Sequence, residues 1–334
     1  MKNKIIFIAE AGINHNGSIN KAIKLVDIAA NSGADYVKFQ ITNSSLISKK
    51  TPKPFYQRKN TKKKENQHEM IKKIEFNWDN AHKKIINYCK KKKIGFLTSA
   101  FCISDAKKVS KLKVDFFKIP SGEITNTPLL KYIGSRNKKT ILSTGMSTIS
   151  EIDSAYKTLL QSGLKRKNLI ILQCTSAYPT PTKELNLNTI LFLKKRYKVE
   201  VGLSDHSIGI VTPIIAIGLG AKYIEKHFTI SKKMKGPDHK ASLVHSELKK
   251  LIRDIRIAEQ SLGSYKKTVT KNEKKNKILV RQSIHAKENI NKGDKFTLRN
   301  IMLKRPGNGM QPNKFENLVG KKSKKKYSKD TPIK

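Results

Sequence analysis

The sequence predicts an α/β protein, a (β/α)₈ TIM barrel followed by a small β-rich domain. Eight short runs rich in β-branched residues alternate with helical patterns, and several runs end in a polar residue that can bind a ligand or transfer a proton. The runs lie near 4–10, 35–40, 95–100, 115–120, 140–144, 169–174, 199–204 and 222–228. The strands of a parallel barrel bring their carboxyl ends to one face, where its functional site lies.

Helical periodicity fills most of the gaps between these runs. Residues 20–34 place apolar side chains at helical spacing and end near Gly33, a candidate C-cap. Residues 77–93 and 246–263 show the same pattern. A doubly wound open sheet is the rival architecture, but it would need a glycine-rich phosphate turn after the first strand. The segment AGINHNG departs from that GxGxxG pattern, so the barrel is the better interpretation.

The same patterns divide the chain into three parts. Residues 1–262 make the barrel domain, and residues 263–279, which are polar and rich in lysine, make a linker. Residues 280–334 alternate short β runs with turns and form a small accessory domain.

Composition limits the partners. The 334 residues carry a formal net charge of +45, but only nine of the 70 basic residues are arginine, the residue that phosphate and base recognition favours. We therefore expect a solvated lysine-rich surface and no nucleic acid; a polyanion-binding surface is the alternative. No run of about 18 apolar residues exists, so we expect no membrane partner. Three cysteines without disulfide or metal spacing indicate a reducing, cytoplasmic location.

Two histidines end neighbouring runs. His206 follows VGLSD and His227 follows YIEK, so each stands beside a carboxylate, Asp205 or Glu225. A single histidine at a strand end is usually a satisfied core or surface residue. Two on adjacent strands instead predict a shared divalent metal ion with open positions for water or substrate.

Two lysines predict an anion site at the same face. Lys38 and Lys118 end the second and fourth runs, and Lys38 shares its strand face with Gln40. Three hydroxyl groups accompany the lysines at strand ends: Ser99, Ser121 and Ser143. Each serine alone is more typical of a turn, and a lysine can also extend to the rim. The convergence predicts a phosphate cradle.

Carboxylates at this face are candidates for proton transfer. We count Glu10, Lys38 and Glu123 as candidate catalytic residues, and Asp238 can add charge or proton-transfer capacity.

The order of these motifs resembles the sialic acid synthase family. The resemblance covers nearly the whole chain and rests on IAEAGINHNG, GADYVKFQ, FKIPSGEITN, ILSTGMST, QCTSAYPTP, VGLSDHS, IEKHFT, GPDHKASL and RPGNGM. It implies a TIM barrel with an antifreeze-like (SAF) domain, in a domain-swapped homodimer whose small domain covers the partner's site. It also implies condensation of phosphoenolpyruvate with N-acetylmannosamine or a related hexosamine, with C–O cleavage and phosphate release.

The resemblance also assigns roles to residues. It implies that His206 and His227 hold Mn²⁺, or another ion such as Mg²⁺ or Co²⁺. The phosphoenolpyruvate ligands that it implies are Lys38, Ser99, Lys118, Ser121 and Ser143. The residues that it implies around the sugar are Glu10, Gln40, Tyr178, Asp238 and, reaching across the dimer, Arg305. FLTSAF and Ser176 depart from the family pattern, so Ser99 takes the phosphate-side hydroxyl role and Ser176 receives none.

Three functions compete. The first is N-acetylneuraminate synthesis from N-acetylmannosamine. The second is a sister activity that makes legionaminic acid, or with less support pseudaminic acid, from a diacetamido hexose; this choice depends on the segment around residues 42–70. The third is a non-catalytic polyanion-binding protein, which would leave the histidine pair and the cradle unexplained.

Overall fold

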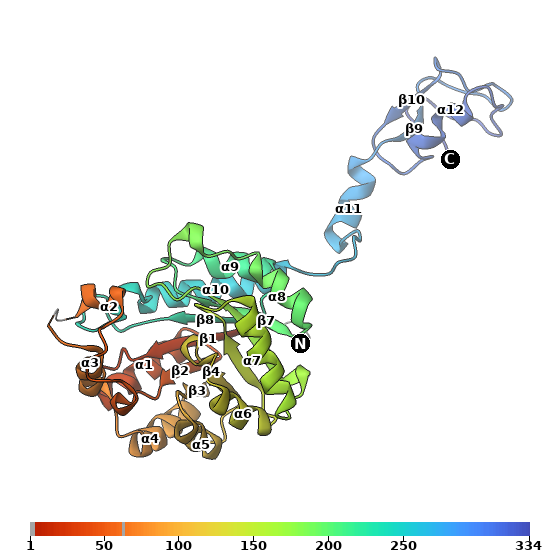
Figure 1. Ribbon diagram of the computed structural model, residues 1–334. Coiled ribbons are helices and arrows are strands. Elements are labelled where there is room, and N and C mark those ends of the chain that lie inside the picture. Colours follow the sequence, from red (N-terminus) through yellow and green to blue (C-terminus); the bar gives the residue numbers. More distant parts are fainter. Residues whose placement is uncertain (1–3, 62–63) are drawn as a thin grey trace. The chain divides into compact units, whose positions relative to one another are not determined.

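Eight parallel strands close into a barrel in the computed structural model, which describes residues 4–61 and 64–334 (Figure 1). Contacts divide the chain into two units, Met1–Gly263 and Ser264–Lys334. The first three residues of the predicted barrel domain, and residues 62–63 of the segment 42–70, lie outside the described residues. The barrel predicted from the alternating pattern is confirmed.

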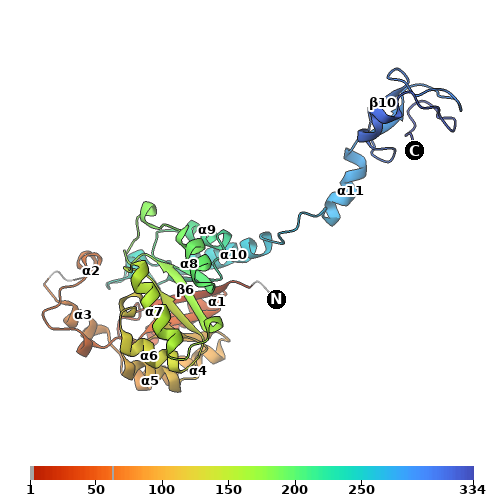
Figure 2. The same cartoon turned by 45° about the vertical axis from the view of Figure 1, so that its right-hand side comes forward.

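Strands and helices alternate through the first unit. The strands are β1 (Ile6–Gly12), β2 (Tyr36–Gln40), β3 (Gly95–Ser99), β4 (Phe117–Ile119), β5 (Thr140–Ser143), β6 (Leu169–Cys174), β7 (Glu200–Asp205) and β8 (Tyr223–His227). The helices are α1 (Ile19–Asn31), α2 (Phe55–Asn60), α3 (Gln67–Ile74), α4 (Trp78–Lys91), α5 (Ile103–Lys111), α6 (Thr127–Ser135), α7 (Ile149–Gln161), α8 (Thr189–Tyr197), α9 (Val211–Gly218) and α10 (His245–Ser261). The longer helices surround the strands (Figures 1 and 2).

Local sequence explains where these helices begin. Ser18 accepts a hydrogen bond from the Lys21 amide at the start of α1, and Thr148 and Glu151 form a capping box at the start of α7. The buried face of α1 carries Ala22, Leu25, Val26, Ile28 and Ala29, which agrees with the predicted helical spacing. The amphipathic pattern of α1 therefore determines which of its faces is buried.

The barrel interior is apolar at one end and polar at the other. Inward side chains of the lower layers form one buried cluster: Ile8, Leu97, Phe116, Ile141, Ile170, Leu172 and Tyr223. Two residues further along the strands, the inward positions carry Glu10, Lys38 and Ser99. Strand register pairs Glu10 with both Lys38 and His227, so the polar ends meet in one layer.

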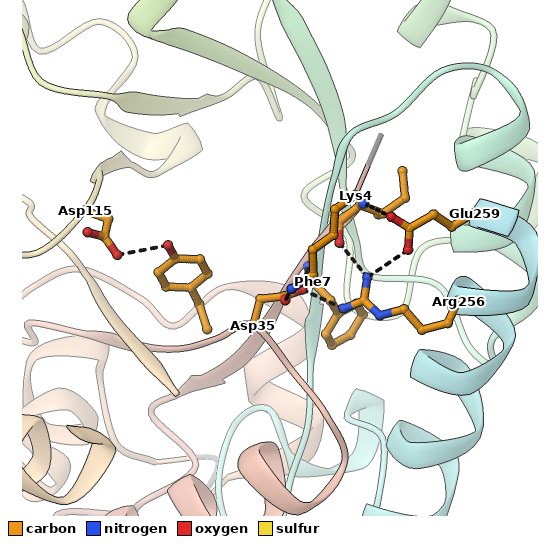
Figure 3. Close-up of polar contacts among 8 residues, drawn as sticks. Lys4, Phe7, Asp35, Asp115, Arg256 and Glu259 are labelled. Carbon is orange, nitrogen blue, oxygen red and sulfur yellow. Dashed lines mark hydrogen bonds and ion pairs between the residues drawn. The ribbon is translucent and has the colours of Figure 1, made fainter. Parts of the chain in front are cut away.

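A network of ion pairs closes the opposite, amino-terminal end. The Asp35 carboxylate accepts hydrogen bonds from the Phe7 amide and from Arg256 of α10, both at 2.7–2.8 Å (Figure 3). Arg256 also donates to the Ile5 carbonyl, and Glu259 accepts from the Ile5 amide. The last barrel helix is thereby tied to the first strand, which stabilises barrel closure far from the polar layer.

The second unit has its own small core. Strands β9 (Ser283–Ala286) and β10 (Ile301–Lys304) pair antiparallel, and a short helix, α12 (Phe315–Leu318), follows them. The core residues are Ile284, Ala286, Ile290, Phe296, Ile301, Leu318, Tyr327 and Ile333. The segment predicted as a linker, 263–279, contains most of helix α11 (Lys271–Val280), which begins with a Thr270–Glu273 capping box and buries no residue.

Within the described residues, no helix is both long and apolar enough to cross a membrane.

A glycine in β7 offers a test of barrel packing. A Cβ at Gly202 would overlap the Tyr223 carbonyl and lie 2.6 Å from Leu172 Cδ2. We expect Gly202→Ala to destabilise the barrel by about 1–3 kcal/mol, the usual range for overpacking. The chain's single tryptophan, Trp78, lies in α4, so its fluorescence during urea unfolding reports the barrel alone. Gly218→Ala, in helix α9 with nothing within 4 Å of the new Cβ, is the matched control and should be neutral or stabilising. Equal unfolding midpoints for the two variants would contradict this packing account.

Candidate active site

A cavity of about 1520 Å³ opens at the carboxyl ends of the barrel strands. The predicted residues that line it are Glu10, Lys38, Gln40, Lys118, Ser121, Glu123, Ser143, Tyr178, His206, His227 and Asp238. Ser99 lies behind the lining, fully buried, and accepts a hydrogen bond from Lys38 at 3.2 Å. Arg305 belongs to the second unit, where it is exposed directly after β10. The barrel thus gathers all the predicted side chains of the first unit.

The centre of this cavity is a buried network of charges. Lys38 Nζ lies 3.0 Å from Glu10 Oε2 and 3.6 Å from Glu225 Oε1, and Lys118 Nζ lies 3.3 Å from Glu225 Oε2. Each of these four side chains is at most 7% exposed. Glu225 therefore bridges the two lysines at the end of β8, where each of its oxygens faces one ammonium group.

The network shifts the protonation of its members in different directions. Burial lowers the pKa of Lys38, but Glu10 and Glu225 outweigh it, so the net shift is upward. Burial dominates at Lys118, whose pKa is lowered. Burial opposes ionisation of Glu225, yet the two lysines lower its pKa to about 2. The two lysines thus share the ionised Glu225, and Lys38 also faces Glu10, so carboxylates compensate both ammonium charges in this structure.

Two hydroxyl groups complete the anion side of the cavity. Ser143 Oγ accepts a hydrogen bond from Lys118 Nζ at 2.5 Å, and Ser121 Oγ accepts one from the Gly145 amide at 2.9 Å. Both oxygens have a hydroxyl proton to donate, so lysines and serines together present donors to a phosphate group.

The two predicted histidines lie side by side at the ends of β7 and β8. Their ring centroids are 5.5 Å apart, and the Tyr178 ring lies against His206 at 4.0 Å. His206 Nδ1 is 2.8 Å from the Thr175 carbonyl, which can only accept, so Nδ1 carries a proton, and in the neutral ring Nε2 keeps its lone pair. His227 Nδ1 is buried and has no hydrogen-bond partner among residues 4–61 and 64–334.

Protonation differs between the two imidazoles. Burial is the main cause that lowers the pKa of His227, and the positive charges of His206 and Lys38 lower it further, so this ring is neutral. Burial also opposes protonation of His206, but Cys174, whose sulfur lies 3.9 Å from His206 Nδ1, raises its pKa overall. His206 in turn lowers the pKa of Cys174 to about 7, against the effect of burial.

Two carboxylic acids stand beside the network with raised pKa values. Burial, followed by the charge of Glu10, raises the pKa of Asp238 to about 7. Burial also raises the pKa of Glu10, which accepts a hydrogen bond from Gln40 Nε2 at 2.8 Å. A group that titrates near neutrality, as Asp238 does, can act as an acid or a base, and the upward shift strengthens Glu10 as a base. Glu123 is half-buried at the rim, where it accepts a hydrogen bond from Asn126.

Sequence reasoning missed two members of this site. Glu225 was noted only as a neighbour of a histidine, although its inward position two residues before His227 signals that it shares the same face. Cys174 ends β6 at an inward position and lines the cavity, but a lone cysteine carries no spacing signal. Neither residue could be paired with its partners before the barrel register was known.

Fold and cavity together define a (β/α)₈-barrel protein whose cavity at the strand ends contains a cluster of buried lysines, carboxylates and histidines. The chain belongs to the NeuB family, whose model matches residues 25–267, and the SAF domain model matches residues 281–334.

Individual relatives extend over almost the entire chain. It is 46% identical over 331 residues to the N,N'-diacetyllegionaminic acid synthase of Campylobacter jejuni, with 99% of each chain covered. It is 38% identical to the protein of that name from Legionella pneumophila, with 98% of this chain and 92% of the relative covered. A crystal structure of the N-acetylneuraminic acid synthetase from Leptospira borgpetersenii, in complex with citrate, aligns with a TM-score of 0.72 at 31% identity, covering 82% of this chain and 90% of that one.

The Glu225 bridge makes a prediction about stability. Glu225→Gln leaves two buried lysines without their shared carboxylate, and the loss of one partner of a buried ion pair costs about 3–5 kcal/mol. Urea unfolding followed by Trp78 fluorescence measures the change. The matched control, Glu123→Gln, exchanges the same groups at the half-buried rim and should cost less than about 1 kcal/mol. Similar losses for both variants would show that Glu225 is not a structural bridge.

Proposed function

We propose that this protein condenses phosphoenolpyruvate with a diacetamido hexose to form a legionaminic-type acid and phosphate. The observation that carries the proposal is the 46% identity, over 99% of both chains, to a protein named N,N'-diacetyllegionaminic acid synthase. The lysine–serine cluster at the strand ends supports it, because it suits the phosphate of phosphoenolpyruvate.

The relatives favour the two candidate sugars in the opposite order from the sequence motifs. N-acetylmannosamine was the first interpretation and the diacetamido hexose the alternative. Both higher-identity relatives carry the legionaminic name, whereas the N-acetylneuraminic acid synthetase is 31% identical. Similarity therefore favours the alternative, while N-acetylmannosamine stays a second candidate.

Mn²⁺ or another divalent cation is part of the proposal, with His206 and His227 as its protein ligands. Both side chains fit this role: the neutral form of His206 carries its proton on Nδ1 and leaves Nε2 as the donor atom, and His227 is neutral with a buried Nδ1 that lacks a hydrogen-bond partner in the described chain. The described residues contain no group of three or more His, Cys, Asp or Glu side chains placed to hold a metal ion. Substrate and water oxygens would complete the coordination. The cation would polarise the aldehyde oxygen of the open-chain sugar.

Residues of this chain supply the remaining steps. Lys38, Lys118 and the serine hydroxyls bind the phosphate and hold phosphoenolpyruvate with its enol carbon toward the sugar. That carbon attacks the aldehyde carbon, which forms a C–C bond, while positive charge develops at the carbon that bears phosphate. Asp238, with its pKa raised to about 7, donates a proton to the former aldehyde oxygen.

Water then adds to the carbon that bears phosphate, and Glu10 accepts a proton from it. Burial raises the pKa of Glu10, which strengthens it as a proton acceptor. The tetrahedral intermediate collapses to a ketone as its C–O bond to phosphate breaks, and the hydroxyl proton leaves with the phosphate group.

We further propose a homodimer in which Arg305 of one protomer completes the sugar site of the other. Arg305 is exposed directly after β10, and a segment without helix or strand, residues 264–270, precedes the unburied helix α11. A rigid guanidinium fork suits an acetamido oxygen.

A substrate panel tests the proposed function. Purified protein with phosphoenolpyruvate and Mn²⁺ should release phosphate fastest with a diacetamido hexose and more slowly with N-acetylmannosamine. Phosphate release only with N-acetylmannosamine would restore the first interpretation. Failure with every sugar in the panel would end the proposal.

The cradle predicts a selective kinetic defect. Lys38→Ala and Lys118→Ala each remove a charge-assisted contact worth about 1.5–3 kcal/mol, so kcat/KM for phosphoenolpyruvate should fall about ten- to a hundredfold. The KM for the sugar should change much less. Unchanged phosphoenolpyruvate kinetics in both variants would count against the cradle.

Metal binding can be measured without turnover. Wild-type protein should bind Mn²⁺ in isothermal titration calorimetry, and His227→Ala should lose this binding because half of the protein ligands are gone. His245→Ala, at the first position of α10, is the control and should bind as wild type does. Equal Mn²⁺ affinity in all three proteins would place the metal elsewhere.

Subunit mixing tests the role of Arg305. Arg305→Ala and His227→Ala chains should each be inactive alone, whereas their heterodimer should regain part of the wild-type activity, since one site combines an intact barrel with an intact arginine. A chain with both substitutions, mixed with either single variant, sets the baseline. Heterodimers no better than that baseline would show that each small unit serves its own barrel.

A further inference from the structure

One wall of the cavity comes from a single connection, the segment between β2 and α4. Its cavity-lining residues include Thr42, Leu46, Ile47, Tyr56, Gln57 and Ile71. None of them belongs to the lysine cradle or the histidine pair. The Tyr56 ring stacks on Tyr178 at 4.5 Å, and Tyr178 lies against His206, so this wall reaches the reaction centre.

The wall is held firmly in place. Lys53 is buried, with 3% of its surface exposed, and donates a hydrogen bond to Thr61 Oγ1. It also forms an ion pair with Glu65, which forms a second ion pair with Lys73 of α3. Beneath it, Ile13 packs with the buried apolar face of α3. A wall fixed by a buried ion pair and a small core can position polar groups for recognition.

Two buried polar side chains of this wall each have one polar atom without a hydrogen-bond partner among the described residues. Gln57 is 6% exposed; its Nε2 donates to Tyr56 Oη at 3.0 Å, while its Oε1 has no hydrogen-bond partner in the described part of the chain. Thr42, two residues beyond Gln40, is 9% exposed, and its Oγ1 likewise has no partner among the residues described. A buried polar atom without a hydrogen-bond partner is unfavourable, so a ligand that supplies the partner is favoured.

The chemistry of these two atoms matches a neutral amide. Gln57 Oε1 can accept from an N–H group, and the Thr42 hydroxyl can donate to a carbonyl oxygen. The same wall carries the apolar side chains of Leu46, Ile47 and Ile71, which suit a methyl group. An acetamido group presents all three features, whereas a hydroxyl group leaves the methyl contact unused.

We infer that Gln57 and Thr42 form a subsite for the second acetamido group of a diacetamido hexose, and so determine which sugar is used. The inference rests on the proposed function. It assigns a different role to this wall from that of the cradle: the cradle binds the donor that every candidate reaction shares, and the wall selects the acceptor.

The test compares two sugars in the full-length protein. Gln57→Leu should lower kcat/KM for the diacetamido hexose about ten- to a hundredfold, as expected when a buried acceptor for a substrate N–H is removed. The same variant should change kcat/KM for N-acetylmannosamine less than about threefold and leave the phosphoenolpyruvate KM unchanged. Thr42→Val, which removes a hydroxyl at nearly constant volume, should show the same selectivity.

Two further variants separate the subsite from general effects. Gln161→Leu, the same exchange at the exposed end of α7, should behave as wild type with both sugars. Tyr56→Phe removes the partner of Gln57 Nε2 but keeps the Oε1 acceptor, so it should retain the preference for the diacetamido hexose.

Each outcome is decisive. Suppose the wild-type protein prefers the diacetamido hexose and both Gln57→Leu and Thr42→Val keep that preference. This result would overturn the subsite but leave the proposed function intact. Wild-type protein that uses only N-acetylmannosamine overturns both. If Gln57→Leu does not fold, the Thr42→Val result alone decides between support and rejection.

Discussion

The structure depends on one interaction, the buried bridge that Glu225 makes between Lys38 and Lys118. Two ammonium groups at most 3% exposed would repel each other and lose their hydration without a carboxylate between them. Glu225 is shared by both lysines and Glu10 lies 3.0 Å from Lys38, so the four side chains form one mutually compensated cluster at the floor of the cavity. An anion that binds there would compete with these carboxylates for the two ammonium groups, and the raised pKa of Glu10 favours loss of its negative charge by protonation.

Barrel register is what brings this cluster together. Glu10 pairs in register with Lys38 on β2 and with His227 on β8, and Ser99 pairs with Lys118. Apolar layers fill the barrel beneath, and the Asp35–Arg256 network ties α10 to β1 at the far end. The residues that stabilise the barrel and the residues that line the cavity therefore lie at opposite ends of the same strands, as is typical of this fold.

The barrel and most of its polar layer could be predicted from the sequence, because polar residues at the ends of apolar strand patterns are recognisable. Alternation of β runs and helices predicted the barrel, and inward polar residues such as Lys38 and His227 marked its upper layer. Glu225 could not be given its role, since its partners are 187 and 107 positions away in the chain and meet only through register. Gln57 and Thr42 were likewise invisible as a pair of unsatisfied atoms, because satisfaction of a hydrogen bond is a property of the folded neighbourhood and not of the residue type.

The central claim is that the Lys38–Lys118 cluster is the anion site of the protein. A crystal structure with bound phosphoenolpyruvate tests it most directly. The account predicts phosphate oxygens within hydrogen-bonding distance of Lys38 or Lys118 Nζ and of the Ser121 or Ser143 hydroxyl groups. A well-ordered phosphoenolpyruvate bound elsewhere in the cavity, with the lysines still paired only to Glu10 and Glu225, would contradict it.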